Sequence, residues 1–124
     1  MDKSETRYDI DTEAVMFAPG AHMDVTAIAA ATQPWWNRTL TAVNDAVVRL
    51  GVLDGDFHWH KHDGEDEFFY VVEGHLDIEL EDRMISLAPG QAVTIPAGVL
   101  HLPHARGRTV VLMVEKAGVV PTGD

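Results

Sequence analysis

Short apolar segments separated by turn residues fill the chain from Leu40 onward. Glycine, proline and acidic clusters recur every few residues, and no long helical period appears after residue 32. This spacing indicates an antiparallel sandwich or barrel and excludes an alternating βα architecture. The sequence therefore predicts an all-β fold whose strands cover residues 46–53, 57–62, 67–72, 75–80, 84–87, 92–95, 101–104 and 109–114.

One short helix is predicted before these strands. Asp24 is a favourable N-cap for residues 25–31, in which apolar side chains recur at helical spacing, and Pro34 follows the end of this segment. The segment before the helix has no clear period and is predicted to be an arm that packs over something else or is partly loose. The chain is thus divided into an N-terminal arm, one domain with a leading helix, and an irregular tail, at residues 1–23, 24–114 and 115–124.

Composition narrows the possible partners. At 124 residues the chain is one domain, and its nine basic and twenty acidic residues leave a formal charge of −11. Such a surface repels a phosphate backbone, so we expect no nucleic-acid partner. No apolar run is long enough to span a bilayer, the segment Met1–Glu13 lacks the apolar stretch of a signal peptide, and there is no cysteine. We therefore expect a cytoplasmic protein without a membrane partner or disulfides.

Histidines at alternate positions suggest a metal site. In a β-strand His58, His60 and His62 would point to the same face, and Glu67 follows after a polar loop. Imidazole nitrogens and a carboxylate together are suitable ligands for a divalent transition metal. His101, from a distant segment, is the candidate for a further ligand.

The segment that ends at His101 supports this grouping. Gly90, Pro96, Gly98 and His101 stand in the pattern G-x5-P-x-G-x2-H. Together with the first segment, this pattern resembles the cupin superfamily. The first cupin motif is a glycine, five residues, H-x-H, three or four residues, a glutamate, six residues and a glycine, and the last four of its fixed positions match the residues His60, His62, Glu67 and Gly74.

Two positions depart from the cupin pattern. The opening glycine of the first motif is displaced, since Asp54 stands there and Gly55 follows, and Ala105 replaces the asparagine that ends the second motif. Neither is a ligand position. A second register, pairing His58 and His60 with Glu65, fails because the motif glycine would then fall at Val72.

The resemblance covers roughly residues 46–114 and implies a cupin-type jelly-roll barrel, or double-stranded β-helix. It also implies one divalent metal ion (Fe, Mn, Ni, Zn, Co or Cu) and a small-molecule ligand. Members of the superfamily include dioxygenases, isomerases and decarboxylases, so we expect an enzyme of one of these types or a non-catalytic binding or sensing module. A homodimer with an exchanged N-terminal strand is a further expectation from the resemblance. The implied metal ligands are His60, His62, Glu67 and His101.

Four further residues are candidates for contact with the small molecule. His58 would lie beside the metal and line the pocket, donate a hydrogen bond or move a proton; the alternative is a structural partner of the ligands. Phe69 shares the inward parity of Glu67. Arg49 is positioned to hold a substrate carboxylate, although a solvent-facing position is the more ordinary alternative. Trp36 is either a wall of the cavity or simple packing.

Overall fold

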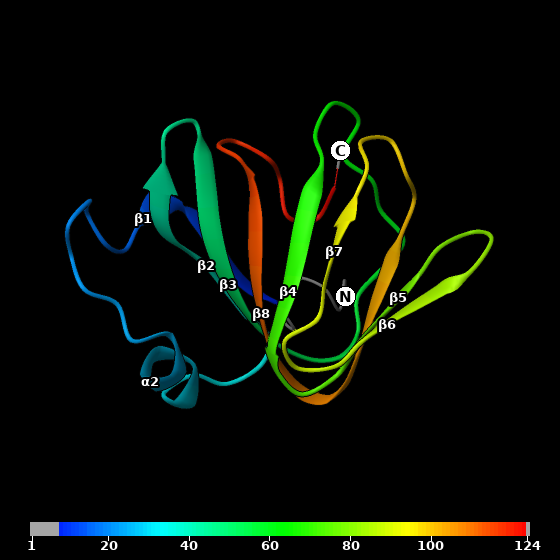
Figure 1. The fold of residues 1–124 in the computed structure, drawn as a ribbon, viewed down its shortest axis with the longest axis horizontal. Helices are drawn as coiled ribbons and strands as arrows, with labels where there is room; N and C mark the ends of the chain where they lie inside the picture. The colour runs from blue at the N-terminus through cyan, green and yellow to red at the C-terminus, as the bar shows by residue number, and fades with distance from the viewer. Residues whose placement is uncertain (1–7, 124) are drawn as a thin grey trace.

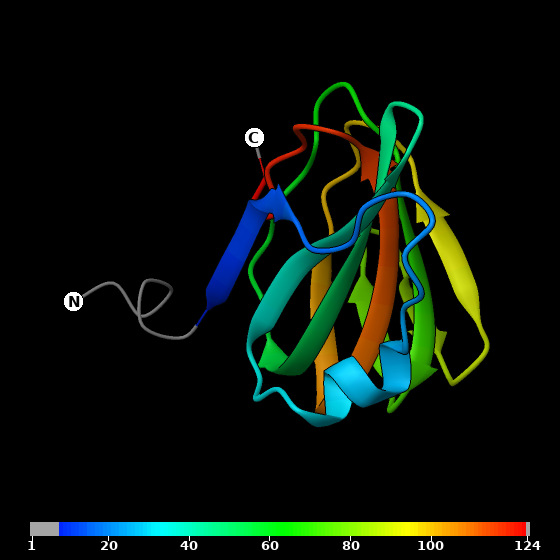
Figure 2. The same cartoon turned by 90° about the vertical axis from the view of Figure 1, so that its left-hand side faces the viewer.

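The computed structural model describes residues 8–123, which form eight strands and one short helix (Figures 1 and 2). The first seven residues of the predicted arm and the last residue of the predicted tail lie outside this range. The predicted all-β class is confirmed. In chain order the elements are β1 (Asp9–Val15), α2 (Val25–Ala30), β2 (Trp36–Val43), β3 (Ala46–Asp56), β4 (Glu67–Glu73), β5 (Leu76–Glu79), β6 (Met84–Leu87), β7 (Ala92–Ile95) and β8 (Leu102–Lys116).

Strand β8 connects the two parts of the sheet. It pairs antiparallel with β3, β4 and β5. The order of neighbouring strands is β1-β2-β3-β8-β4-β7, and β5 branches from this order by pairing with β8 on one side and β6 on the other. In Figure 1, β2, β3, β8 and β4 lie side by side, and β5 with β6 lies on the other side of the interior. A fifteen-residue strand bends enough to serve both parts, so the sheet curls around its own apolar face.

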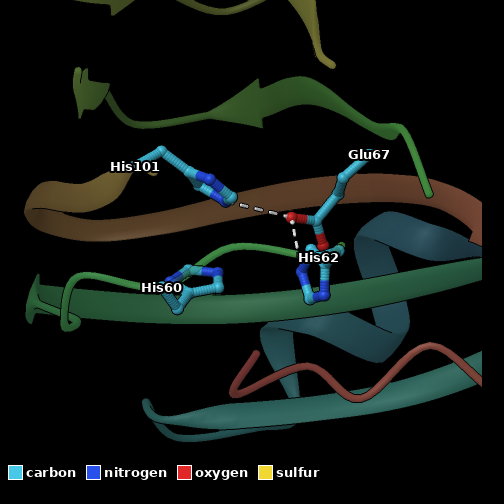
Figure 3. Close-up of side chains that lie close together, drawn as sticks. All are labelled: His60, His62, Glu67 and His101. Carbon is cyan, nitrogen blue, oxygen red and sulfur yellow. Dashed lines mark hydrogen bonds and ion pairs between the residues drawn. The ribbon is translucent and has the colours of Figure 1, made fainter. Parts of the chain in front are cut away.

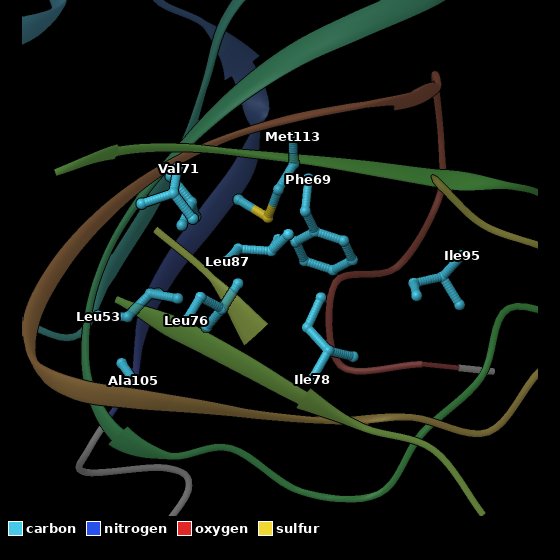
Figure 4. Close-up of a cluster of buried hydrophobic side chains, with 10 residues drawn as sticks. Leu53, Phe69, Val71, Leu76, Ile78, Leu87, Ile95, Ala105 and Met113 are labelled. Carbon is cyan, nitrogen blue, oxygen red and sulfur yellow. The ribbon is translucent and has the colours of Figure 1, made fainter. Parts of the chain in front are cut away.

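Apolar side chains fill two separate regions, one on each face of β3. The larger region lies inside the curled sheet (Figure 4), and the smaller lies between the outer face of β2 and β3 and the helix α2. Because successive strand residues point to opposite faces, β3 contributes Leu53 to the first and Leu50 and Val52 to the second. The inner region comprises Leu53, Phe69, Val71, Leu76, Ile78, Leu87, Ile95, Ala105, Val111 and Met113.

Helix α2 confirms the predicted helix and its N-cap. The Asp24 side chain accepts a hydrogen bond of 3.0 Å from the backbone N–H of Ala27. Ala29 is fully buried against the outer face of the sheet, and Arg108 of β8 donates to its carbonyl. No helix within residues 8–123 is long and apolar enough to cross a membrane.

Three strand predictions were wrong. Residues 57–62 form no regular strand, and only His60 pairs, through an isolated bridge. The segments 101–104 and 109–114 belong to one strand, because the predicted turn at residues 106–108 is a bulge, with Gly107 at φ +73° and a register shift against β3. Part of the N-terminal arm is the strand β1, which pairs parallel with β2.

Gly74 directly follows the last residue of β4, at a point where a side chain would have no room. Its φ is +88°, and a Cβ there would lie 2.6 Å from Thr109 Oγ1 and 2.7 Å from the Arg108 carbonyl. The hairpin from β4 to β5 therefore passes directly against β8, and only glycine meets both requirements. This is the physical reason for a glycine seven positions after Glu67.

His104 links three strands at the surface. Its Nδ1 lies 2.7 Å from Asp56 of β3 and its Nε2 lies 2.9 Å from Glu79 of β5, while His104 itself is in β8. The hydrogen bond with Asp56, supported by Glu79 and opposed by partial burial, raises the pKa of His104 above its ordinary value of 6.5. The protonated ring can donate to both carboxylates at once.

This link predicts a pH-dependent contribution to stability. A raised pKa in the folded state means that the contribution is fully present below pH 6.5 and is lost as the pH rises through the folded-state pKa. We expect His104→Gln to lower the free energy of unfolding by up to about 1 kcal/mol at pH 6 and by less at pH 9, as measured by urea denaturation. The exposed His22, replaced by glutamine, is the control for loss of an imidazole. An equal effect of His104→Gln at both pH values would contradict the prediction.

Candidate metal centre

Two distant segments meet through the backbones of His60 and His101. The N–H of His60 donates to the carbonyl of His101 at 3.0 Å, and the reverse bond measures 2.9 Å. Two residues further, the carbonyl of His62 accepts from the N–H of Gly98 at 2.8 Å. The connection between β3 and β4 is therefore fixed against the segment that leads into β8, although it is not a strand.

Glu67 enters the same site from the first position of β4. Its neighbour across the sheet is Ile95 of β7, and both residues are buried. Just before it, the Asp66 side chain accepts from the N–H of Ala97 at 2.9 Å. The start of β4 is thus fixed by the loop that also holds His62.

The four predicted ligands lie together and are buried (Figure 3). One donor atom of each residue can be chosen so that all lie within 4.8 Å of one another. Glu67 Oε1 lies 3.3 Å from Nε2 of both His62 and His101. Metal–ligand bonds of about 2.0–2.2 Å require donor separations of this order, so the residues are positioned to bind a metal ion. The set is His60, His62, Glu67 and His101.

Two of the rings are held in the tautomer that a metal requires. Nδ1 of His60 lies 2.9 Å from the carbonyl of His58, and Nδ1 of His101 lies 3.0 Å from the carbonyl of Val99. A carbonyl only accepts, so Nδ1 carries the proton and donates it. The Nε2 lone pairs of both rings therefore face the site, as is usual for metal-binding histidines.

The ionisation states also suit a cation. Burial, reinforced by His101, lowers the pKa of His60 from 6.5 to about 4, so this ring is neutral at physiological pH. Burial alone would raise the pKa of Glu67, but its close contacts with His101, His62 and Glu115 outweigh it and hold that pKa well below its usual range. The donor set is thus a carboxylate with neutral imidazole nitrogen, which fits a divalent transition metal.

A buried pair of an arginine and a glutamate side chain lies behind the ligand Glu67. Arg49 Nη1 is 2.7 Å from Glu115 Oε1, and the two side chains are 3% and 1% exposed. The same nitrogen donates to the Val119 carbonyl at 2.8 Å, and Nε donates to Thr39 Oγ1 at 3.3 Å. Burial, followed by the negative charge of Glu67, raises the pKa of Glu115 above its usual range despite Arg49.

An apolar pocket opens beside the metal ligands. His60 and Glu67 form part of its wall, and most of the remaining wall is aromatic or aliphatic. Phe69 and Trp36, two of the predicted contact residues, line it. The other residues of the wall are Ile10, Trp35, Asn37, Leu53, Phe57, Pro103, Met113 and Pro121.

The other two predicted contact residues lie elsewhere. His58 is half-buried, its ring centroid is 5.3 Å from that of His60, and its Nε2 donates to the Thr122 carbonyl at 2.8 Å. His58 is absent from the pocket wall. Arg49 is also absent from it, and the expectation that it faces solvent was wrong, because the side chain is buried by its pairing with Glu115.

Sequence reasoning missed Glu115 and Asn37. Glu115 shares the inward parity of Met113, but the sequence analysis assigned it to the irregular tail, whereas β8 continues to Lys116. Asn37 lies in β2 at a point where the alternation is hidden by two tryptophans. For Glu115 the usable signal was the period-two pattern, extended beyond the predicted strand 109–114. For Asn37 there was no such signal, because β2 itself was not predicted.

The pairing of Arg49 with Glu115 predicts that substitutions of these two residues lower the free energy of unfolding by different amounts. Arg49→Met removes the buried cation next to two buried carboxyl groups and is expected to lower the free energy of unfolding by about 3–5 kcal/mol. Glu115→Gln mimics the protonated acid and should cost about 1 kcal/mol. Urea denaturation of the metal-free proteins measures both. A loss for Glu115→Gln as large as that for Arg49→Met would show that Glu115 is ionised.

Comparison with known proteins agrees with the fold. The family model described as "Cupin domain" matches residues 46–115. The Bacillus subtilis (strain 168) protein YdbB is 40% identical over 80 residues, which cover 64% of this chain and 71% of that protein.

Solved structures extend the comparison. A cupin-2 domain containing protein from Shewanella frigidimarina NCIMB 400 is 34% identical, with a TM-score of 0.69 over 73% of this chain and 89% of that chain. The Neisseria meningitidis protein NMB1881 shares the fold at 21% identity, with a TM-score of 0.70 over 78% of this chain and all of that chain. With its family model, its curled sheet and its His-His-Glu-His group, the chain belongs to the cupin superfamily.

Proposed function

We propose that this protein binds one divalent transition metal ion through His60, His62, Glu67 and His101 and uses it to convert a small organic molecule. The reaction is of the oxygen-dependent, isomerising or decarboxylating type. A bound ion would supply Lewis-acid polarisation of a ligand oxygen or a more acidic water. The chain itself supplies the ligands, their orientation and an apolar enclosure.

One observation carries this proposal. Two of the four buried donor residues, His60 and Glu67, are also part of the pocket wall, so the pocket reaches the metal site directly. A structural site is closed by protein on all sides, whereas a catalytic site keeps open coordination positions. An apolar wall next to such positions also excludes water from the reacting atoms. This arrangement favours turnover over a purely structural metal.

Removal of single ligands tests the metal site. We expect His60→Ala and His101→Ala to abolish stoichiometric metal binding, because each deletes one of four donors. Elemental analysis of protein purified without an affinity tag gives the metal content, and thermal melting gives the stability. His22→Ala, outside the site, is the control. Retention of one metal per chain by both ligand variants would contradict the proposed site, and unchanged melting of the metal-depleted variants would exclude a mainly structural metal.

Turnover separates an enzyme from a binding module that uses the same donors. Metal-loaded protein is incubated with small acids and diols while oxygen uptake and product formation are followed. Metal-dependent turnover that disappears in His101→Ala supports catalysis. Binding of the same compounds without any turnover supports a non-catalytic sensing role.

We also propose a homodimer. Strand β1 lies at one end of the strand order, so its outer edge is available for a second chain. Two large apolar side chains at the end of β1, Val15 and Met16, are exposed. Sedimentation at micromolar concentration should give twice the chain mass of 13.6 kDa. A monomer under these conditions would exclude the dimer.

A further inference from the structure

The wall of the pocket has an unusual distribution of charge. Apart from Glu67 and His60, which belong to the metal centre, its described residues are apolar or aromatic with one exception, Asn37, and none of them is a lysine or an arginine. Three neutral imidazoles and one carboxylate leave a divalent ion with a net charge of +1. The positive charge available to a ligand is therefore at the metal, not in the rest of the described wall.

Arg49 does not change this balance. Arg49 is a buried cation, but its Nε and Nη1 are bonded to Thr39, Glu115 and Val119, and it is not part of the pocket wall. The formal charge of the chain, −11, disfavours a second anionic group further. A ligand with a carboxylate or phosphate away from the metal would thus be desolvated without a partner, which is costly.

Asn37 is the one uncharged polar side chain in the wall. Its neighbour across the sheet is Gly51 of β3, which has no side chain to bond with it. The Oδ1 atom is buried and has no hydrogen-bond partner among the described residues. A buried amide oxygen without a donor is unfavourable, so this atom is prepared for a donor from outside the chain.

We propose that the pocket selects an uncharged, largely apolar small molecule that has one metal-binding oxygen group and a hydroxyl or N–H group directed at Asn37. Asn37 is the residue that determines specificity within this pocket. The inference rests on the proposed function, since the metal holds the first group. Burial of the body against Phe69, Trp35 and Met113 supplies affinity, and the hydrogen bond to Asn37 fixes orientation.

Hydroxamic acids with a constant metal-binding group test the inference. The probes are acetohydroxamic acid, butanohydroxamic acid, its 3-hydroxy and 4-hydroxy derivatives, and succinic monohydroxamic acid, which places a carboxylate where butanohydroxamic acid has a methyl group. Binding is measured by titration of the Co²⁺-loaded protein, followed by absorption. Burial of two additional CH₂ groups should make butanohydroxamic acid bind about tenfold more tightly than acetohydroxamic acid. Succinic monohydroxamic acid should bind at least about tenfold more weakly than butanohydroxamic acid.

The variant Asn37→Leu tests the specificity residue, with the unhydroxylated ligand as its internal control. The comparison uses whichever of the 3-hydroxy and 4-hydroxy derivatives binds the unmodified protein more tightly. We expect the substitution to raise the dissociation constant of this derivative about tenfold more than that of butanohydroxamic acid, since only the hydroxylated compound loses a hydrogen bond. Metal content and melting temperature are measured in parallel. An equal effect on both ligands overturns the role of Asn37. Binding of succinic monohydroxamic acid as tight as that of butanohydroxamic acid overturns the inference that the ligand is uncharged. No binding of acetohydroxamic acid to fully metal-loaded protein overturns the proposed function itself.

Discussion

The backbone bridge between His60 and His101 is the contact on which the site depends. It joins a loop without regular strand structure to the start of the longest strand, and so brings ligands from two distant segments to one point. Each of the two rings is further held by a hydrogen bond from its Nδ1 to a carbonyl two residues earlier. The chain therefore orders the donors when it folds, so metal binding need not do so.

Charge compensation explains why a carboxylate can be buried at this point. Glu67 is 3% exposed, a position that an isolated carboxylate would occupy only at great cost. Nε2 of His62 and Nε2 of His101 lie 3.3 Å from its Oε1 on one side, and Glu115, paired with Arg49, lies on the other. The fold thus supports the negative charge that a cation needs through residues that are not themselves ligands.

The sequence predicted the four ligands more accurately than the structure that holds them. The alternation of His60 and His62 was interpreted as a strand, whereas the segment is a loop that stays extended because His60 and His62 each bond to the neighbouring segment. The motif spacing was sufficient to identify the four ligands because it reflects the geometry of the ligand set and does not depend on the local secondary structure. It could not reveal the partner of Arg49, since Glu115 lies 66 positions away. The strand β1 escaped prediction because its side chains are largely exposed and carry no strict apolar alternation.

The pairing of β3 with β8 has a consequence for how the protein is made. β3 is buried on both faces over most of its length, and its main partner is the last strand of the sheet. During synthesis β3 leaves the ribosome long before β8, so the edge that pairs with β8 and the inner face stay uncovered while the intervening strands are translated. The domain can therefore complete its sheet only after β8 has emerged, and the waiting chain carries its most aggregation-prone segment unprotected until then. A slow release of the final residues would prolong this exposure, and a chaperone that covers residues 46–56 would shorten it.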